Sequence, residues 1–93
     1  MGKYHLKLYI TGQTPRSENA IRNLREICTE NLDEKYEIEI IDILEHPQLA
    51  EDERILATPT LIKSLPPPLR RLIGDLSETE KVLFGLDIRP CKI

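Results

Sequence analysis

The sequence predicts a single α/β domain whose elements follow the order βαβαββα. Three observations support this prediction. Apolar residues alternate with polar ones in some stretches, as in half-buried strands, and recur at helical spacing in others. Proline and glycine separate these stretches from one another. A length of 93 residues suffices for one hydrophobic core and not for two.

The first half of the chain has the clearer pattern. Residues 4–11 alternate and predict a strand. Thr14 followed by Pro15 is typical of an N-cap with proline in the first helical turn, and helical spacing continues over 15–31. The isoleucine-rich residues 36–44 predict a second strand. Because a helix connects the two strands, we expect them to be parallel, in a right-handed βαβ unit.

The second half has a weaker pattern. Residues 47–56 suit a short helix that begins at a proline, and 60–65 suit a short strand. The prolines at 66–68 exclude regular structure there, and 69–73 predict another strand.

The last predicted element is a helix from Ser77 to about Leu86. Ser77 and Glu80 have the spacing of a capping box, in which each side chain bonds an unpaired backbone N–H of the first turn. We expect Gly85 inside this helix, with a left-handed cap at Gly85 as the alternative. The summed order is that of the thioredoxin fold. Pro59, in the loop before the third strand, is then a candidate cis-proline.

Thiol chemistry does not accompany this scaffold. A thioredoxin-type reductase needs a cysteine at the N-terminus of the first long helix, and residues 12–17 contain none. Cys28 lies on the apolar stripe of that helix and is expected to be a buried structural thiol, whereas Cys91 is expected to be exposed. The two cysteines fit no metal-ligand spacing, so we expect no metal site.

Composition and motifs argue against several classes of function. The net charge of −3 argues against a nucleic-acid partner, and no apolar run predicts a membrane span or signal peptide, so we expect a cytoplasmic protein. Glu51–Glu53 are adjacent carboxylates on a helix surface, and His5 and His46 have no evident nucleophile or metal partner. No phosphate-binding glycine motif occurs. We therefore expect no catalytic residues, no cofactor and no enzyme activity.

Three stretches together carry a family resemblance: LKLYITGQTP at 6–15, IDILEHPQLAE at 41–51 and ILATPTLIKSLPPPLRRLIGDLSETEKVLFGLD at 55–87. They are similar to the KaiB family, the small components of the Kai clock system. The resemblance covers nearly all of the chain to Asp87. The run over 55–87 is its most specific part, because ordinary thioredoxins do not share it.

The resemblance implies a metamorphic protein with two folds in one domain over residues 1–93. A ground state of order βαββααβ would assemble as a homodimer or homotetramer. A thioredoxin-like monomer would bind the N-terminal ATPase ring of the KaiC hexamer and modulate its phosphorylation and ATPase cycle. Residues 1–44 would be common to both folds and 47–93 would refold. The alternatives are a thioredoxin-like KaiC-binding sensor module that does not switch fold and, more distantly, a thiol–disulfide redox protein.

The resemblance also implies roles for individual residues. Gln48, Leu49 and Arg54 would face KaiC; the alternative is that Gln48 and Arg54 are merely solvated and Leu49 belongs to the core. The balance between the two folds would rest on three further residues, Tyr4, Gly85 and Asp87.

The second predicted strand departs from the family pattern. Clock KaiB proteins typically carry a small residue and a lysine where this chain has Glu37 and Glu39. That strand is the edge that the family offers to KaiA, so two carboxylates there argue against KaiA as a partner. The expected protein is a KaiB paralogue, or a KaiB from a system with KaiC and no KaiA.

Overall fold

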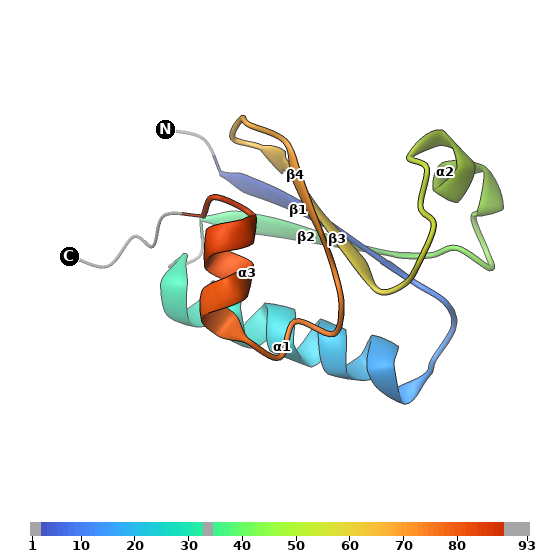
Figure 1. Cartoon of the computed structure of the whole chain (residues 1–93), viewed down its shortest axis with the longest axis horizontal. Helices are drawn as coiled ribbons and strands as arrows, with labels where there is room; N and C mark the ends of the chain where they lie inside the picture. Colours follow the sequence, from blue (N-terminus) through green and yellow to red (C-terminus); the bar gives the residue numbers. More distant parts are fainter. Residues whose placement is uncertain (1–2, 33–34, 89–93) are drawn as a thin grey trace.

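The computed structural model describes residues 3–32 and 35–88 (Figure 1). Its elements follow the predicted order βαβαββα. They are β1 (Tyr4–Ile10), α1 (Pro15–Asn31), β2 (Tyr36–Asp42), α2 (Pro47–Asp52), β3 (Thr60–Leu65), β4 (Arg70–Ile73) and α3 (Thr79–Gly85).

The four strands form one mixed sheet in the order β2-β1-β3-β4. β1 and β2 are parallel, with Tyr4 opposite Tyr36 and Ile10 opposite Asp42, so the predicted βαβ unit is confirmed. β3 runs antiparallel to β1 and to β4. The first half of the chain thus supplies one side of the sheet and the second half the other, and they meet where β1 pairs with β3.

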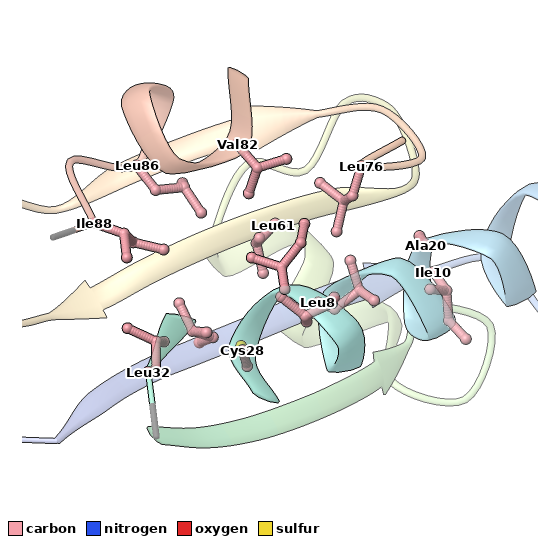
Figure 2. Close-up of a cluster of buried hydrophobic side chains, with 13 residues drawn as sticks. Leu8, Ile10, Ala20, Cys28, Leu32, Leu61, Leu76, Val82, Leu86 and Ile88 are labelled. Atoms are coloured by element: carbon pink, nitrogen blue, oxygen red, sulfur yellow. The ribbon is translucent and has the colours of Figure 1, made fainter. Parts of the chain in front are cut away.

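The main core lies between the sheet and the two helices on one face of it, α1 and α3 (Figures 1 and 2). α1 presents its apolar stripe to β1, and the turn after α3 closes the cluster from the second half. The buried members of this cluster are Leu6, Leu8, Ile10, Ala20, Leu24, Ile27, Cys28, Leu32, Leu61, Leu76, Val82, Leu86 and Ile88.

A second, smaller cluster lies on the opposite face of the sheet. Tyr9, Ile41 and Ile62 are buried there, with Ile43 and Ile55 packed against them. The alternation in β1 predicts Tyr9 on the more polar face, which is correct, yet its exposed fraction is 1%. The connections on either side of α2 cover this end of the sheet, and strand alternation alone carries no signal for that.

The start of α1 is as predicted. Thr14 is the N-cap, its Oγ1 accepts a hydrogen bond from the Ser17 backbone N–H at 3.1 Å, and Pro15 occupies the first turn. The Thr14 side chain thus pairs one backbone N–H of the first turn, and Pro15 has no N–H that needs a partner.

The predicted capping box of the last helix is wrong. α3 begins at Thr79 and its N-cap is Glu78, which makes no side-chain cap hydrogen bond. The Ser77 N–H instead donates to Asp75 Oδ1 at 3.2 Å, and Leu76 before it has a φ of 65°. The Asp75 side chain thus stabilises a local turn that carries the chain past Ser77 before the helix can start.

Candidate functional site

α2 stands apart from the other two helices, at the end of the sheet where the chain leaves β2 and enters β3 (Figure 1). Every one of its six residues is described and none is buried. Gln48 is exposed, and its Nε2 donates to Asp52 Oδ1 at 3.0 Å within the helix. Leu49 is 40% exposed, so the alternative that places Leu49 in the core is wrong. Arg54 is also exposed.

An apolar groove follows the helix and includes Arg54. Its lining residues are Pro47, Ala50, Glu51, Arg54, Ile55 and Leu56. Leu56 is 94% exposed. Leu56 is not predicted as a surface residue, because the predicted helix extends over 47–56. α2 ends earlier than predicted because of the backbone conformation of Arg54. The spacing of apolar residues does not predict that conformation.

The end of α2 is held from β4. Arg54 has a φ of 55°, a left-handed conformation that turns the chain out of the helix. The Arg71 guanidinium donates to two consecutive carbonyls at this turn, from Nη2 to Glu53 O at 2.8 Å and from Nη1 to Arg54 O at 3.3 Å. The contact of Arg71 with α2 is not predictable from the sequence, because β4 lies far from α2 along the chain.

The outer edge of β2 carries the two glutamates of the predicted KaiA-facing strand. Within the described sheet, β2 pairs with β1 alone. Glu37 and Glu39 are both exposed, and Glu37 lies 3.5 Å from Lys3 Nζ and 3.8 Å from His5 Nδ1. Exposed pairs of this kind contribute little to stability, and the outer edge of β2 has no strand paired with it in the part of the chain that the structure describes.

Two threonines, Thr11 and Thr58, lie beside residues 12–17, the segment where a thioredoxin would carry its cysteines. The Thr58–Pro59 peptide bond is cis, as predicted. The Oγ1 atoms of Thr11 and Thr58 lie 2.6 Å apart, between the end of β1 and this proline loop. Cys28 is fully buried in the main core (Figure 2), and burial raises the pKa of its thiol to about 12. Cys91 lies outside the described residues.

Two of the residues expected to balance the folds meet around a buried lysine. Lys63 on β3 is 1% exposed, and its Nζ lies 5.9 Å from the centre of the Tyr4 ring. The same Nζ donates to the backbone carbonyl of Asp87 at 3.2 Å. This contact is not predictable from the sequence, because lysine on a short strand is normally solvated.

The C-terminus of α3 has its left-handed residue at Asp87. Asp87 has a φ of 54°, whereas Gly85, the last residue of α3, is outside the left-handed region. The alternative that Gly85 is the left-handed cap is therefore wrong. A Cβ at Gly85 would lie 3.3 Å from Leu72 Cδ1, a tight contact with a side chain on β4.

Two classes of site find no support in residues 3–32 and 35–88. No helix there is both long and apolar enough to cross a membrane. No group of three or more His, Cys, Asp or Glu side chains in the same ranges is placed to hold a metal ion.

Comparison with known sequences gives one consistent result. The KaiB domain family matches residues 7–88. The circadian clock protein KaiB3 of a Synechocystis strain is 61% identical over 90 residues, covering 97% of this chain and 88% of the relative. A circadian clock oscillator protein KaiB of Prochlorococcus marinus is 58% identical over 85 residues, covering 91% and 81%.

Comparison with solved structures gives the fold. The N-terminal domain of Synechococcus elongatus SasA superposes with a TM-score of 0.78 at 21% identity, over 100% of this chain and 90% of that domain. Mitochondrial thioredoxin 3 of Saccharomyces cerevisiae superposes with a TM-score of 0.72 at 14% identity, over 94% and 79%. The predicted thioredoxin-like fold is confirmed.

Proposed function

This chain belongs to the KaiB family, and from that premise we propose that it is a cytoplasmic, non-enzymatic clock protein that binds the N-terminal ATPase ring of KaiC. Binding would modulate the KaiC phosphorylation and ATPase cycle. The observation that carries the proposal is the exposed surface of α2 and the groove beside it, because a helix with no buried residue has no structural role that explains its apolar side chains.

The chemistry of that surface suits a protein partner. Leu56 and Leu49 offer apolar area, and Arg54 places a guanidinium in the same groove. Exposed apolar patches mark interaction sites, and arginine is enriched among the residues that dominate binding energy at protein interfaces. By contrast α1, which is longer, buries its apolar face inside the molecule.

The proposal excludes turnover by the chain itself. Cys28 is the cysteine within the described ranges, and its thiol is buried with a pKa raised to about 12, so it is protonated at neutral pH. An insulin-reduction assay with this protein and dithiothreitol should match the reagent alone. Reduction that is lost in Cys28→Ser or Cys91→Ser would contradict the proposal and restore the redox alternative.

A direct test uses two exposed apolar residues as a matched pair. Leu56 is 94% exposed beside α2, and Phe84 is 91% exposed on α3. Mixed with the cognate KaiC hexamer, the wild-type protein should elute in a ring-sized complex on size-exclusion chromatography. Leu56→Glu should elute separately from KaiC, whereas Phe84→Glu should co-elute. Loss of binding in the Phe84 variant alone would place the KaiC-binding surface on α3.

We further propose that residues 47–93 change fold and that the thioredoxin-like form described above is the one that binds KaiC. The free protein would then assemble as a dimer or tetramer in the ground-state fold and become monomeric on the ring. Among the described elements of residues 47–88, α2, β4 and α3 are short and bury little, which suits a segment with a second packing of similar energy.

A thioredoxin-like sensor module that does not switch fold is the second candidate, and the likeness to the SasA domain over the whole chain favours it. The two candidates differ in the free protein. Sedimentation velocity without KaiC should show a dimer or tetramer for a protein that switches fold. A monomer at all concentrations would instead support the sensor module.

The acidic edge of β2 leads us to propose that KaiA is not a partner. Glu37 and Glu39 would place like charges against an acidic partner strand and would repel it. A cyanobacterial KaiA should show no association with this protein, even when KaiC is present. A Glu39→Lys variant that gains KaiA binding would support the argument, and a ternary complex of the wild-type protein would overturn it.

A further inference from the structure

α2 is too short and too exposed to be stable on its own. It has six residues, its N-cap His46 makes no side-chain hydrogen bond, and none of its residues is buried. Isolated helices of this length are unstable in water, because too few hydrogen bonds compensate the cost of the first turn. The order of α2 must therefore come from contacts at its two ends.

One end is tied to β2 and the other to β4. Before α2, the Asp42 carboxylate accepts from the Leu44 N–H at 2.9 Å and also from the Gly12 N–H at 3.1 Å. After α2, Ile55 packs against the small cluster on the second face of the sheet. The Arg71 guanidinium completes this end by its bonds to Glu53 O and Arg54 O.

The geometry of Arg71 suits this task. Leu72 packs against the main core, so strand alternation places Arg71 on the other face of β4, toward α2. A guanidinium has several donors in a rigid plane and can bond two neighbouring carbonyls at once. It also lies at the C-terminal end of α2, where the helix dipole favours a positive charge. Burial raises the pKa of the nearby Tyr9 phenol, the carboxylates of Glu53 and Glu39 raise it further, and Arg71 opposes them.

We infer that Arg71 is a positioning residue for the partner surface: by holding the left-handed turn at Arg54, it fixes the groove beside α2 in its binding geometry. The surface is then complete only when β4 is paired with β3, because that pairing sets Arg71 in place. β4 thereby couples the folding of the second half to binding. This inference rests on the proposed binding of KaiC through α2.

The experiment compares two neighbouring arginines. Arg71→Gln removes the charge and the paired donors, and Arg71→Lys keeps the charge with a single donor group. Arg70→Gln is the matched control, since Arg70 lies on the opposite side of β4, beside α3. Dissociation of each variant from the KaiC hexamer is measured by surface plasmon resonance. Arg71→Gln should bind about tenfold more weakly, which is about 1.4 kcal/mol. Arg71→Lys should fall between it and the wild type, and Arg70→Gln should stay within about twofold of the wild type.

Hydrogen exchange on the thioredoxin-like form, enriched by a Gly85→Ala background shared by every variant, separates positioning from direct contact. In Arg71→Gln the amides of Arg54 and Ile55, which donate to Glu51 O and Ala50 O, should lose protection while α1 keeps it. Weaker binding with unchanged exchange would mean that Arg71 touches the partner directly and would overturn the inference, as would binding equal to that of Arg70→Gln. If the wild-type protein does not bind KaiC at all, the proposed function fails. The exchange measurement alone then decides whether Arg71 holds α2.

Discussion

The two halves of the molecule achieve order in different ways. In residues 3–44, α1 runs for 17 residues and buries five of them against the sheet. In residues 47–88, α2 buries none of its described residues and α3 buries Val82. Within the described ranges, the non-glycine residues with a left-handed backbone all belong to the second half, namely Arg54, Leu76 and Asp87.

This difference shows what each half depends on. The first half is stabilised by one long helix on a parallel strand pair, so its order is largely local. The second half also contributes to the main core through β3, Leu76 and the turn after α3, but its loops and helix ends depend on single contacts, such as Asn23 Nδ2 to Asp75 O at 2.8 Å and Lys63 Nζ to Asp87 O at 3.2 Å. A region held in this way can open without unfolding the rest. The proposed partner surface lies in that region.

The largest effect should come from one truncation made in each half. Leu24 on α1 is 1% exposed and Leu86 after α3 is 0% exposed. Leu24→Ala should lower the free energy of global unfolding by about 2–5 kcal/mol, as buried leucine truncations do. Leu86→Ala makes the same chemical change, but hydrogen exchange should first increase over residues 60–88 while α1 stays protected. Simultaneous loss of protection in both halves of Leu86→Ala would remove the distinction between them.

The stability of the folded protein should fall at alkaline pH because of the buried Cys28 thiol in the first half. Burial raises the pKa of this thiol from 9.0 to about 12, so the unfolded chain releases the proton first as the pH rises. The free energy of unfolding should be unaffected by this group below pH 9 and fall between pH 9 and 12, by up to about 1.4 kcal/mol per pH unit. Urea unfolding of the wild type and Cys28→Ala across this range gives the difference. Parallel pH profiles would mean that the thiol is solvated.

Two glycines of the second half should respond in opposite directions to alanine. Gly74 has a φ of 136° and nothing within 4 Å of an added Cβ, so Gly74→Ala strains the backbone alone and should destabilise the thioredoxin-like fold. Gly85→Ala should favour that fold by up to about 1 kcal/mol of helix propensity. The tight approach to Leu72 reduces this gain. Sedimentation velocity should show more monomer for Gly85→Ala, and a shift toward oligomer would mean that the Leu72 contact outweighs the propensity.

The smallest effect should come from the charge at Asp87. A carboxylate near the C-terminus of α3 opposes the helix dipole, which costs a few tenths of a kcal/mol to about 1 kcal/mol. Asp87→Arg reverses that charge, but arginine tolerates a φ of 54° less well than aspartate does, so its two effects oppose each other. Asp87→Asn removes the charge and keeps the tolerance, and should increase the monomer fraction slightly. If the monomer fraction of Asp87→Arg is larger than that of Asp87→Asn, the favourable interaction of arginine with the helix dipole outweighs its backbone strain.

Much of this fold follows from the sequence because its signals are local. Thr14 and Pro15 mark the start of α1, and strand alternation gives β1, β2 and β3 to within two residues of their observed ends. The failures involve contacts between distant residues. The predicted capping box at Ser77 does not form, because the Ser77 backbone N–H donates to the Asp75 carboxylate instead. α2 ends at Asp52 because the chain turns at Arg54. Leu56 and Arg71 belong to the candidate surface only once β4 is placed beside α2.

The buried ammonium of Lys63 makes this lysine a chemical reporter. Lys3 and Lys81 are exposed, with side chains 58% and 78% accessible, and an amine-reactive reagent should acylate them at once. Lys63, at 1% exposure between the Tyr4 ring and the Asp87 carbonyl, can react only after β3 separates from its neighbours. When the open chain recloses faster than it is acylated, the rate at which mass spectrometry finds acyl-Lys63 reports the fraction of wild-type molecules whose second half is open. At reagent concentrations where acylation is faster than reclosing, it reports the rate of opening.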